Sequence, residues 1–191
     1  AGTVYSNPAS VSVASVEQAT VVVEKTEFYN DRTSEVVVSG SGFLPELATG
    51  TRAPFLHQSA GAYVAFGKFA DEWRPSTGAQ PSTRNLPSGD FGKGVGFIWA
   101  VPYEEVANGD SAYGFLDAEG NFEVKLQVNE EWLEDKAGNY GIYTYPGSGG
   151  DQPAYETYTP IRFIAAPPVP TFTSAPQDVS VAVGSTAKFT V

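Results

Sequence analysis

LDAEGNFEVKLQV (Leu116–Val128) is the stretch that decides the fold class. It begins with a turn signal at Asp117–Gly120 and continues with strict alternation of apolar and polar residues. The apolar residues are Phe122, Val124, Leu126 and Val128. Because successive side chains of a strand point to opposite faces, this segment predicts an antiparallel strand with one buried face and one exposed face.

Similar runs of β-branched and aromatic residues recur along the chain, separated by Gly, Pro, Asn and Asp. The predicted strands are Val11–Val16, Thr20–Lys25, Ser34–Ser39, Ala62–Phe69, Gly96–Val101, Asn121–Val128, Gly138–Tyr145 and Tyr158–Phe163. A short helix is predicted within Pro102–Tyr113. Regularly spaced short strands with turn residues between them predict an all-β protein, an immunoglobulin-like antiparallel β-sandwich with long loop insertions.

The stretch GAYVAFGKFADEWRP (Gly61–Pro75) is a strand that ends at a long loop. Alternation places Val64 and Phe66 toward the core, and Tyr63 and Phe69 on the opposite face. The favoured interpretation of Trp73 and Arg74 is that they cover the open end of the sandwich. The loops 44–60 and 74–94 have little strand signal, and loops of this length often carry function.

The chain divides into three parts by composition. Residues 1–165 are predicted to form the sandwich, 166–176 a proline-rich linker, and 177–191 the first strands of a truncated second immunoglobulin-like domain. Two strands cannot bury a core by themselves. We therefore expect the neighbouring domains of the same chain to be partners of the sandwich.

Composition excludes several classes of protein. The chain of 191 residues has a net charge of -11, which makes nucleic acid an unfavourable partner. It has no cysteine, so it has neither disulfides nor thiolate metal sites. No apolar run reaches the roughly 18 residues that span a bilayer, so direct membrane insertion is not expected. We expect a mature segment whose signal peptide has been removed.

Five blocks of sequence resemble a module of actinobacterial cell-wall and secreted proteins that often occurs alongside HtaA-type haem-uptake domains. These blocks are VVVSGSGF (Val36–Phe43), GAYVAFGKFADEWRPSTGA (Gly61–Ala79), FIWAVP (Phe97–Pro102), DAEGNFEVKL (Asp117–Leu126) and GNYGIYTYPGSGG (Gly138–Gly150). The resemblance implies an immunoglobulin-like sandwich that is extracellular or attached to the cell wall. The tail TSAPQDVSVAVGSTAKFTV (Thr173–Val191) resembles the opening strands of an intermediate-set immunoglobulin-like domain. The haem-binding stretch of the HtaA system has no counterpart in this chain.

Three kinds of chemistry are open at the level of sequence. The single histidine, His57, is an exposed loop residue by default, although with a tyrosine it has the chemistry of a haem ligand. Asp117, Glu119 and Asn121 alternate as oxygen ligands of calcium would, but a hairpin turn is the simpler explanation. An isopeptide bond would need a buried lysine, for which Lys25, Lys68 and Lys125 are the candidates.

Aromatic residues give the strongest binding signal. The chain has 10 tyrosines and 3 tryptophans, and exposed rings bind sugars by stacking or anchor protein interfaces. The candidate ligand-binding residues are Trp73, Arg74, Tyr143, Tyr145 and Tyr155. A structural use of these rings is the favoured alternative, because strands are rich in aromatic residues.

The sequence thus predicts a non-catalytic extracellular module that acts in spacing, adhesion or ligand capture, with a surface protein or a glycan as partner. The alternatives are a carbohydrate-binding module of a secreted glycoside hydrolase and an accessory domain in haem or iron uptake.

Overall fold

The computed structural model describes residues 17–88, 95–171 and 180–187. Its strands are β1 (Thr20–Val23), β2 (Glu27–Tyr29), β3 (Ser34–Ser41), β4 (Ala62–Phe69), β5 (Arg84–Asn85), β6 (Phe97–Val101), β7 (Tyr113–Phe115), β8 (Phe122–Val128), β9 (Asn139–Pro146), β10 (Thr157–Pro160) and β11 (Arg162–Ile164). The helix α1 spans Glu104–Gly109. Four short 3-10 turns are η1 (Pro75–Thr77), η2 (Pro81–Thr83), η3 (Glu130–Trp132) and η4 (Pro153–Tyr155).

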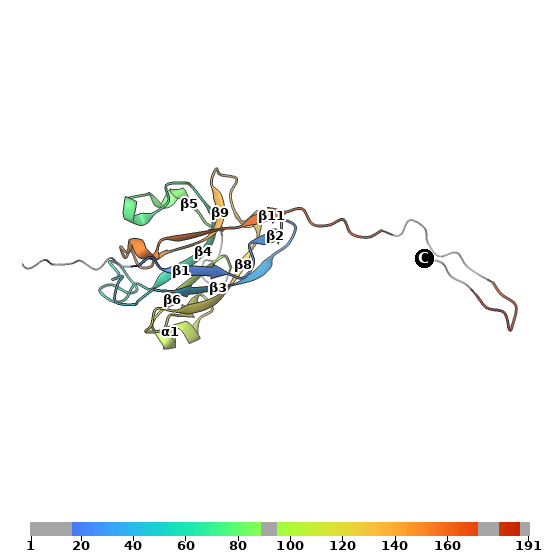
Figure 1. Ribbon diagram of the computed structural model, residues 1–191, viewed down its shortest axis with the longest axis horizontal. Helices are drawn as coiled ribbons and strands as arrows, with labels where there is room; N and C mark the ends of the chain where they lie inside the picture. The colour runs from blue at the N-terminus through green and yellow to red at the C-terminus, as the bar shows by residue number, and fades with distance from the viewer. Residues whose placement is uncertain (1–16, 89–94, 172–179, 188–191) are drawn as a thin grey trace, which may run out of the picture.

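Two sheets form the sandwich (Figure 1). One has the order β1-β3-β8, and the other has the order β10-β9-β4-β6-β7 with β5 paired to β4. A third, two-stranded pair joins β11 to β2 in parallel. The structure confirms the all-β sandwich with long loop insertions that the sequence predicts. It adds two parallel pairs, β6–β7 and β11–β2, to the antiparallel arrangement.

The main core lies between the two sheets. β8 buries every second residue, and its intervening residues are exposed, as the alternation in the sequence predicts. From the other sheet, Val64 and Phe66 of β4 and Ile142 of β9 join this core, each with none of its surface exposed. The turn at Asp117–Gly120 is also confirmed, with the amide of Gly120 donating to the carbonyl of Asp117.

A second, largely aromatic layer covers the outer face of the larger sheet. Tyr63 and Phe69 of β4, as the alternation predicts, point to this side together with Tyr143 and Tyr145 of β9. Trp99 of β6 continues the layer toward α1 and the loop 44–60. The long loops and α1 cover the outer side of the larger sheet, so this sheet is buried on both faces. This second layer accounts for much of the aromatic content of the chain.

The predicted strand Tyr158–Phe163 is divided in the structure. β10 pairs with β9, the chain turns at the buried Ile161, and β11 pairs with β2.

The short strands β2, β5 and β7 carry no periodic signal, and the sequence does not predict them. The predicted helix within Pro102–Tyr113 is confirmed as α1. The predicted strand Val11–Val16 lies outside the described residues, as does part of the predicted truncated domain.

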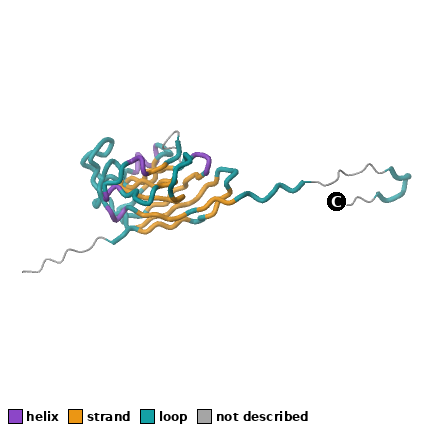
Figure 2. The backbone as a smooth tube through the Cα atoms, turned by 90° about the horizontal axis from the view of Figure 1, so that it is seen from above, coloured by secondary structure: helices purple, strands orange, loops and turns teal. Residues whose placement is uncertain are grey.

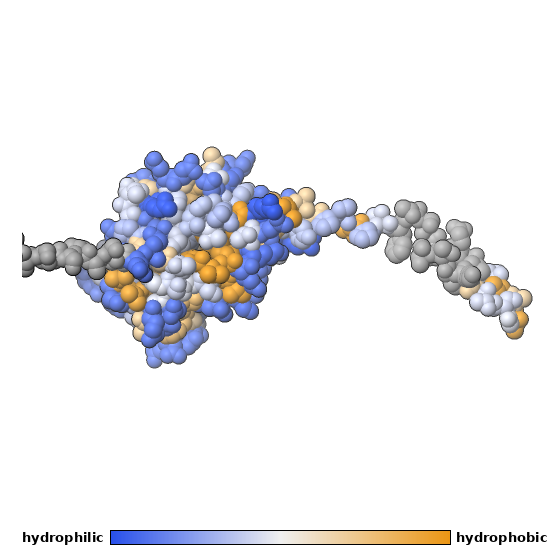
Figure 3. All heavy atoms as spheres, viewed as in Figure 1, coloured by the Kyte–Doolittle hydropathy of each residue, from blue (hydrophilic) through white to orange (hydrophobic). Residues whose placement is uncertain are grey.

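The strands run side by side along the long axis, with most of the loops gathered at one end (Figure 2). The described chain enters the sandwich at that end and leaves beyond β11 at the opposite end (Figure 1). The visible surface is mainly hydrophilic, with apolar residues gathered over β1 and β3 (Figure 3). Val22 of β1 is 63% exposed there.

Candidate functional site

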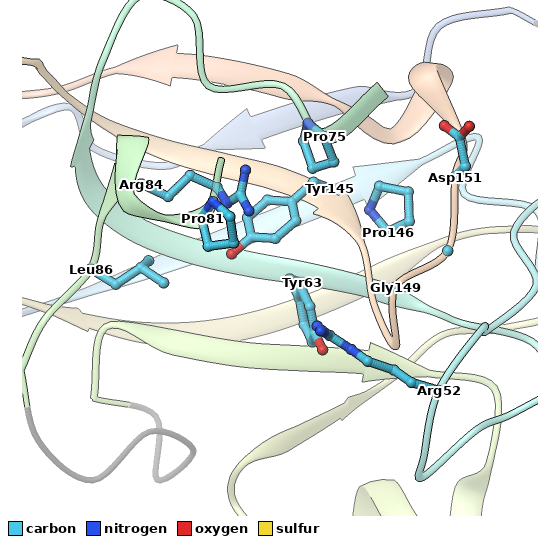
Figure 4. A pocket seen from close by; sticks show the side chains of 11 residues that line it. Arg52, Tyr63, Pro75, Pro81, Arg84, Leu86, Tyr145, Pro146, Gly149 and Asp151 are labelled. Carbon is cyan, nitrogen blue, oxygen red and sulfur yellow. The ribbon is translucent and has the colours of Figure 1, made fainter. Parts of the chain in front are cut away.

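A pocket opens on the outer face of the larger sheet, between the loop 44–60 and the loop after β4 (Figure 4). It has a volume of about 470 Å³. The lining residues come from the loop 44–60, from β4, from the segment that follows β4, and from the end of β9 with the turn after it: Arg52, Tyr63, Pro75, Pro81, Arg84, Leu86, Tyr145, Pro146, Gly149, Gly150 and Asp151. We refer to it as the arginine–tyrosine pocket. Its volume lies within the range of small-molecule binding sites.

Two tyrosines form the floor of the pocket. Tyr63 and Tyr145 are register partners on β4 and β9, and their ring centroids lie 5.2 Å apart in an edge-on arrangement. Tyr145 is 7% exposed, and burial raises the pKa of its hydroxyl above the ordinary value, although Arg84 and Arg52 oppose this. The hydroxyl of Tyr145 is therefore protonated at neutral pH and available as a hydrogen-bond donor.

Arg84 lies on one side of the pocket, and backbone carbonyls of the loop after β4 hold its guanidinium. Its Nη1 donates to the carbonyls of Trp73 (2.9 Å) and Ala79 (3.5 Å). Its guanidinium carbon lies 5.5 Å from the ring centroid of Tyr145, a cation–π distance. These contacts fix the guanidinium beside the floor of the pocket and leave other N–H groups of its fork for a ligand.

Arg52 reaches the pocket from the loop 44–60, and its backbone is anchored by Ser148. The amides of Thr51 and Arg52 donate to the carbonyl of Ser148 (2.9 and 3.2 Å). The hydroxyl of Ser148 donates to the carbonyl of Arg52, and its amide donates to the hydroxyl of Tyr63 (3.1 Å). Arg52 is thus tied to the floor of the pocket, while its side chain is exposed.

Ser148 is in a rare backbone conformation. It is 1% exposed and has a φ of 46°, in the left-handed region that non-glycine residues seldom adopt. Such conformations persist only where surrounding contacts hold them, and they cluster at binding and catalytic sites. The hydrogen bonds of Ser148 to the segment 51–55 supply those contacts here.

Proline rings and one carboxylate complete the pocket. Pro75, Pro81 and Pro146 form rigid apolar walls, and Asp151 lies on the side opposite Arg84, with Tyr145 and Tyr63 between them (Figure 4). Asp151 is the one carboxylate among the described lining residues, and it is exposed. The lining therefore combines two cationic groups with one carboxylate that can accept hydrogen bonds.

The predicted site residues Trp73, Tyr143 and Tyr145 come together in the aromatic layer. Tyr143 is 1% exposed and stacks on Phe69, with ring centroids 3.9 Å apart, and Trp73 lies edge-on to it at 5.0 Å. Trp73 is 3% exposed, and the guanidinium of Arg74 lies over its ring. Trp73 and Arg74 line a smaller hollow of about 310 Å³ with Asp71, Glu72 and Thr77.

Tyr155 lies apart from this cluster, in the main core. It has none of its surface exposed, its ring packs against Phe43, and its hydroxyl donates to the carbonyl of Leu44. Of the predicted tyrosines, only Tyr145 reaches the pocket. The sequence did not indicate Tyr63, Arg52, Arg84, Ser148 or Asp151, although the two long loops predicted as contact surfaces supply Arg52 and Arg84.

The oxygen-rich hairpin is stabilised by contacts within itself. The carboxylate of Asp117 accepts from the backbone amide (2.7 Å) and the side-chain amide (3.1 Å) of Asn121. The hydrogen bond from the Asn121 backbone amide is the main cause that lowers the pKa of Asp117 below its ordinary value of 3.8. Glu119 is exposed at the turn. No cluster of three or more metal-ligating side chains occurs within the described residues.

The remaining candidates lie outside the pocket. His57 is exposed on the loop 44–60 with a φ of 61°. Lys68 pairs with Asp135 at 3.8 Å, Lys125 pairs with Glu35 at 3.5 Å, and Lys25 lies over the ring of Phe28. Each lysine considered for an isopeptide bond thus makes a non-covalent contact.

Comparisons with protein-family models, with curated proteins and with solved structures found no match to this chain. In the part of the chain that the structure describes, no helix is long and apolar enough to cross a bilayer.

Proposed function

We propose that this chain is a non-catalytic extracellular module of a multidomain surface or secreted protein, and that it captures a ligand in the arginine–tyrosine pocket. The observation that carries the proposal is the pocket itself. Two arginines, two tyrosines and three prolines from four separate segments converge on a volume of about 470 Å³. Concave sites with rigid apolar walls and a few convergent polar groups are typical ligand sites.

The chemistry of the lining favours binding over catalysis. Arginine stays charged at any physiological pH, and the raised pKa of Tyr145 keeps its hydroxyl protonated. Hydrolysis of a glycosidic bond usually needs two carboxyl groups across a cleft. Asp151 is the single carboxylate among the described lining residues.

The course of the chain supports a role in spacing as well. The chain enters the sandwich at its loop-rich end and leaves at the opposite end (Figure 1). A module built in this way adds its length to a row of domains. Because the pocket lies on the side of the larger sheet, neighbouring domains in such a row would leave it accessible.

A pair of matched variants tests this proposal. D151W places an indole at the mouth of the pocket, whereas E119W places the same indole on the exposed hairpin turn; each variant loses one carboxylate. An array of glycans, cell-wall polysaccharides and surface proteins is probed with the wild type and both variants. We expect at least one component to bind the wild type and E119W equally, and D151W at least about tenfold more weakly.

Thermal unfolding of the three proteins shows whether the substitutions leave the fold intact. An array with no bound component contradicts the proposal, as does binding that D151W retains in full.

A further inference from the structure

The charge of the pocket is unusual for this chain. The chain carries 22 acidic against 11 basic residues. Among the residues that the structure describes, five basic residues pair with a carboxylate: Arg32, Lys68, Lys125, Lys136 and Arg162. Arg52 and Arg84 form no such pair with any described residue, and the same holds for Lys25 and Arg74, which lie over the aromatic rings of Phe28 and Trp73. Two guanidinium groups without a carboxylate partner among the described residues therefore line one pocket of an acidic protein.

The guanidinium of Arg84 is held by contacts that leave donors free, whereas Arg52 is anchored through its backbone and its side chain is exposed. Arg84 uses Nη1 on the carbonyls of Trp73 and Ala79, and the backbone of Arg52 is tied to Ser148. Guanidinium groups recognise the planar, paired oxygens of a carboxylate. Because Arg84 is already positioned, a ligand carboxylate would bind to it without ordering it first.

The rest of the pocket selects among ligands that carry a carboxylate. Tyr63 and Tyr145 lie on β4 and β9, whose backbones pair with each other, so an extended peptide finds no free strand edge at the floor. Asp151 in the lining disfavours a group that brings about two negative charges into the pocket, as a phosphate monoester does, more than it disfavours a single carboxylate. Asp151 can instead accept hydrogen bonds from hydroxyl groups, and the proline rings offer apolar contact to the C–H groups of a sugar ring.

We propose that the arginine–tyrosine pocket recognises a uronic-acid unit of an acidic polysaccharide. Arg52 and Arg84 hold the ring carboxylate, the Tyr145 hydroxyl donates to a sugar oxygen, and Asp151 accepts from sugar hydroxyls. This inference rests on the proposed function, since it names the class of ligand that the same pocket takes.

The probes are trimers of galacturonate, glucuronate and mannuronate, each measured beside the neutral trimer of the corresponding sugar. Isothermal titration calorimetry at low and at moderate salt gives the affinities. We expect at least one uronate trimer to bind the wild type at least about tenfold more tightly than its neutral counterpart, and more weakly as salt rises.

Two substitutions test the role of the arginines. R52Q removes an exposed charge whose side chain makes no hydrogen bond within the described residues, and it should weaken uronate binding at least about tenfold. R84K keeps the charge but loses the planar fork, so it should weaken binding as well. R32Q is the matched control, because Arg32 is also exposed but pairs with Asp31 away from the pocket. We expect R32Q to bind like the wild type.

Other outcomes overturn the inference in distinguishable ways. The pocket could bind a neutral trimer, a phosphorylated ligand or an acidic peptide in place of the uronates, and lose that binding in D151W. This result overturns the ligand class and leaves the proposed function standing. Uronate binding that R52Q and R84K retain in full overturns the role of the arginines. If no probe and no array component binds the pocket, both the inference and the proposed function fail.

Discussion

Trp73 lies 3% exposed beneath Arg74, with its ring edge-on to Tyr143 and Phe69. From sequence alone, a cover for the core is the favoured interpretation of this aromatic residue at the root of a long loop, and a contact surface is the alternative. Burial decides between them, because a ring that is packed on several sides has little surface left for stacking on a ligand. Trp73 therefore belongs to the second hydrophobic layer.

We expect W73A to lower the free energy of unfolding by about 3–5 kcal/mol, the usual cost of deleting a large buried aromatic side chain. Urea unfolding followed by circular dichroism measures it. R74Q is the control, because Arg74 is exposed and its contact with the ring should contribute only about 0.5–1 kcal/mol. If the free energies of unfolding of W73A and R74Q differed by less than about 1 kcal/mol, the ring would contribute no packing.

At the scale of elements, a buried carboxylate fastens the loop after β4 to the sandwich. Glu156 follows η4, is 3% exposed, and accepts from the amide (2.7 Å) and the hydroxyl (2.6 Å) of Ser76 in η1. The same loop carries Pro75, Pro81 and Arg84 into the pocket. The contact between η4 and η1 thus positions one wall of the pocket.

We expect E156Q and S76A each to lower the free energy of unfolding by about 1–3 kcal/mol, since each leaves a buried polar group poorly satisfied. The double variant should cost less than the sum, because both changes break the same contact. Denaturant unfolding measures all three against S82A, an exposed serine in η2. Strictly additive costs would mean that the two residues do not act as one contact.

At the scale of the whole molecule, buried tyrosines couple stability to alkaline pH. Burial raises the pKa of Tyr140 from the ordinary 10.0 to about 12, with a further contribution from its hydrogen bond to Glu130. Burial also raises the pKa values of Tyr143, Tyr145 and Tyr155. The unfolded chain then loses these protons at lower pH than the folded chain does, so unfolding becomes more favourable as pH rises above 10.

Below about pH 9, these tyrosines should not change the free energy of unfolding. From about pH 10 upward, we expect their ionisation to lower it progressively. Urea unfolding at a series of pH values measures the fall, and absorbance at 295 nm reports tyrosine ionisation. Y140F should show a shallower fall, because phenylalanine carries no proton to lose. Unchanged stability between about pH 10 and 11.5 would contradict the tyrosine coupling.

Local sequence patterns are sufficient to predict the sandwich and the faces of its long strands. β8 and β4 lie where alternation predicts them, with Val64 and Phe66 in the main core and Tyr63 and Phe69 opposite. Side-chain periodicity is local, so it can be read from a single strand. The two long loops were also evident, because their Pro, Gly and Ser content interrupts that periodicity.

Only the tertiary structure decided which residues meet at the pocket. Arg52, Arg84 and Asp151 are far apart in the sequence and lie in segments without periodicity, so no local pattern joins them. The short strands β2 and β5 form because distant partners offer them hydrogen bonds. Whether a tyrosine packs in a core or faces a pocket depends on what covers it, and here that cover is supplied by loops folded back over the larger sheet.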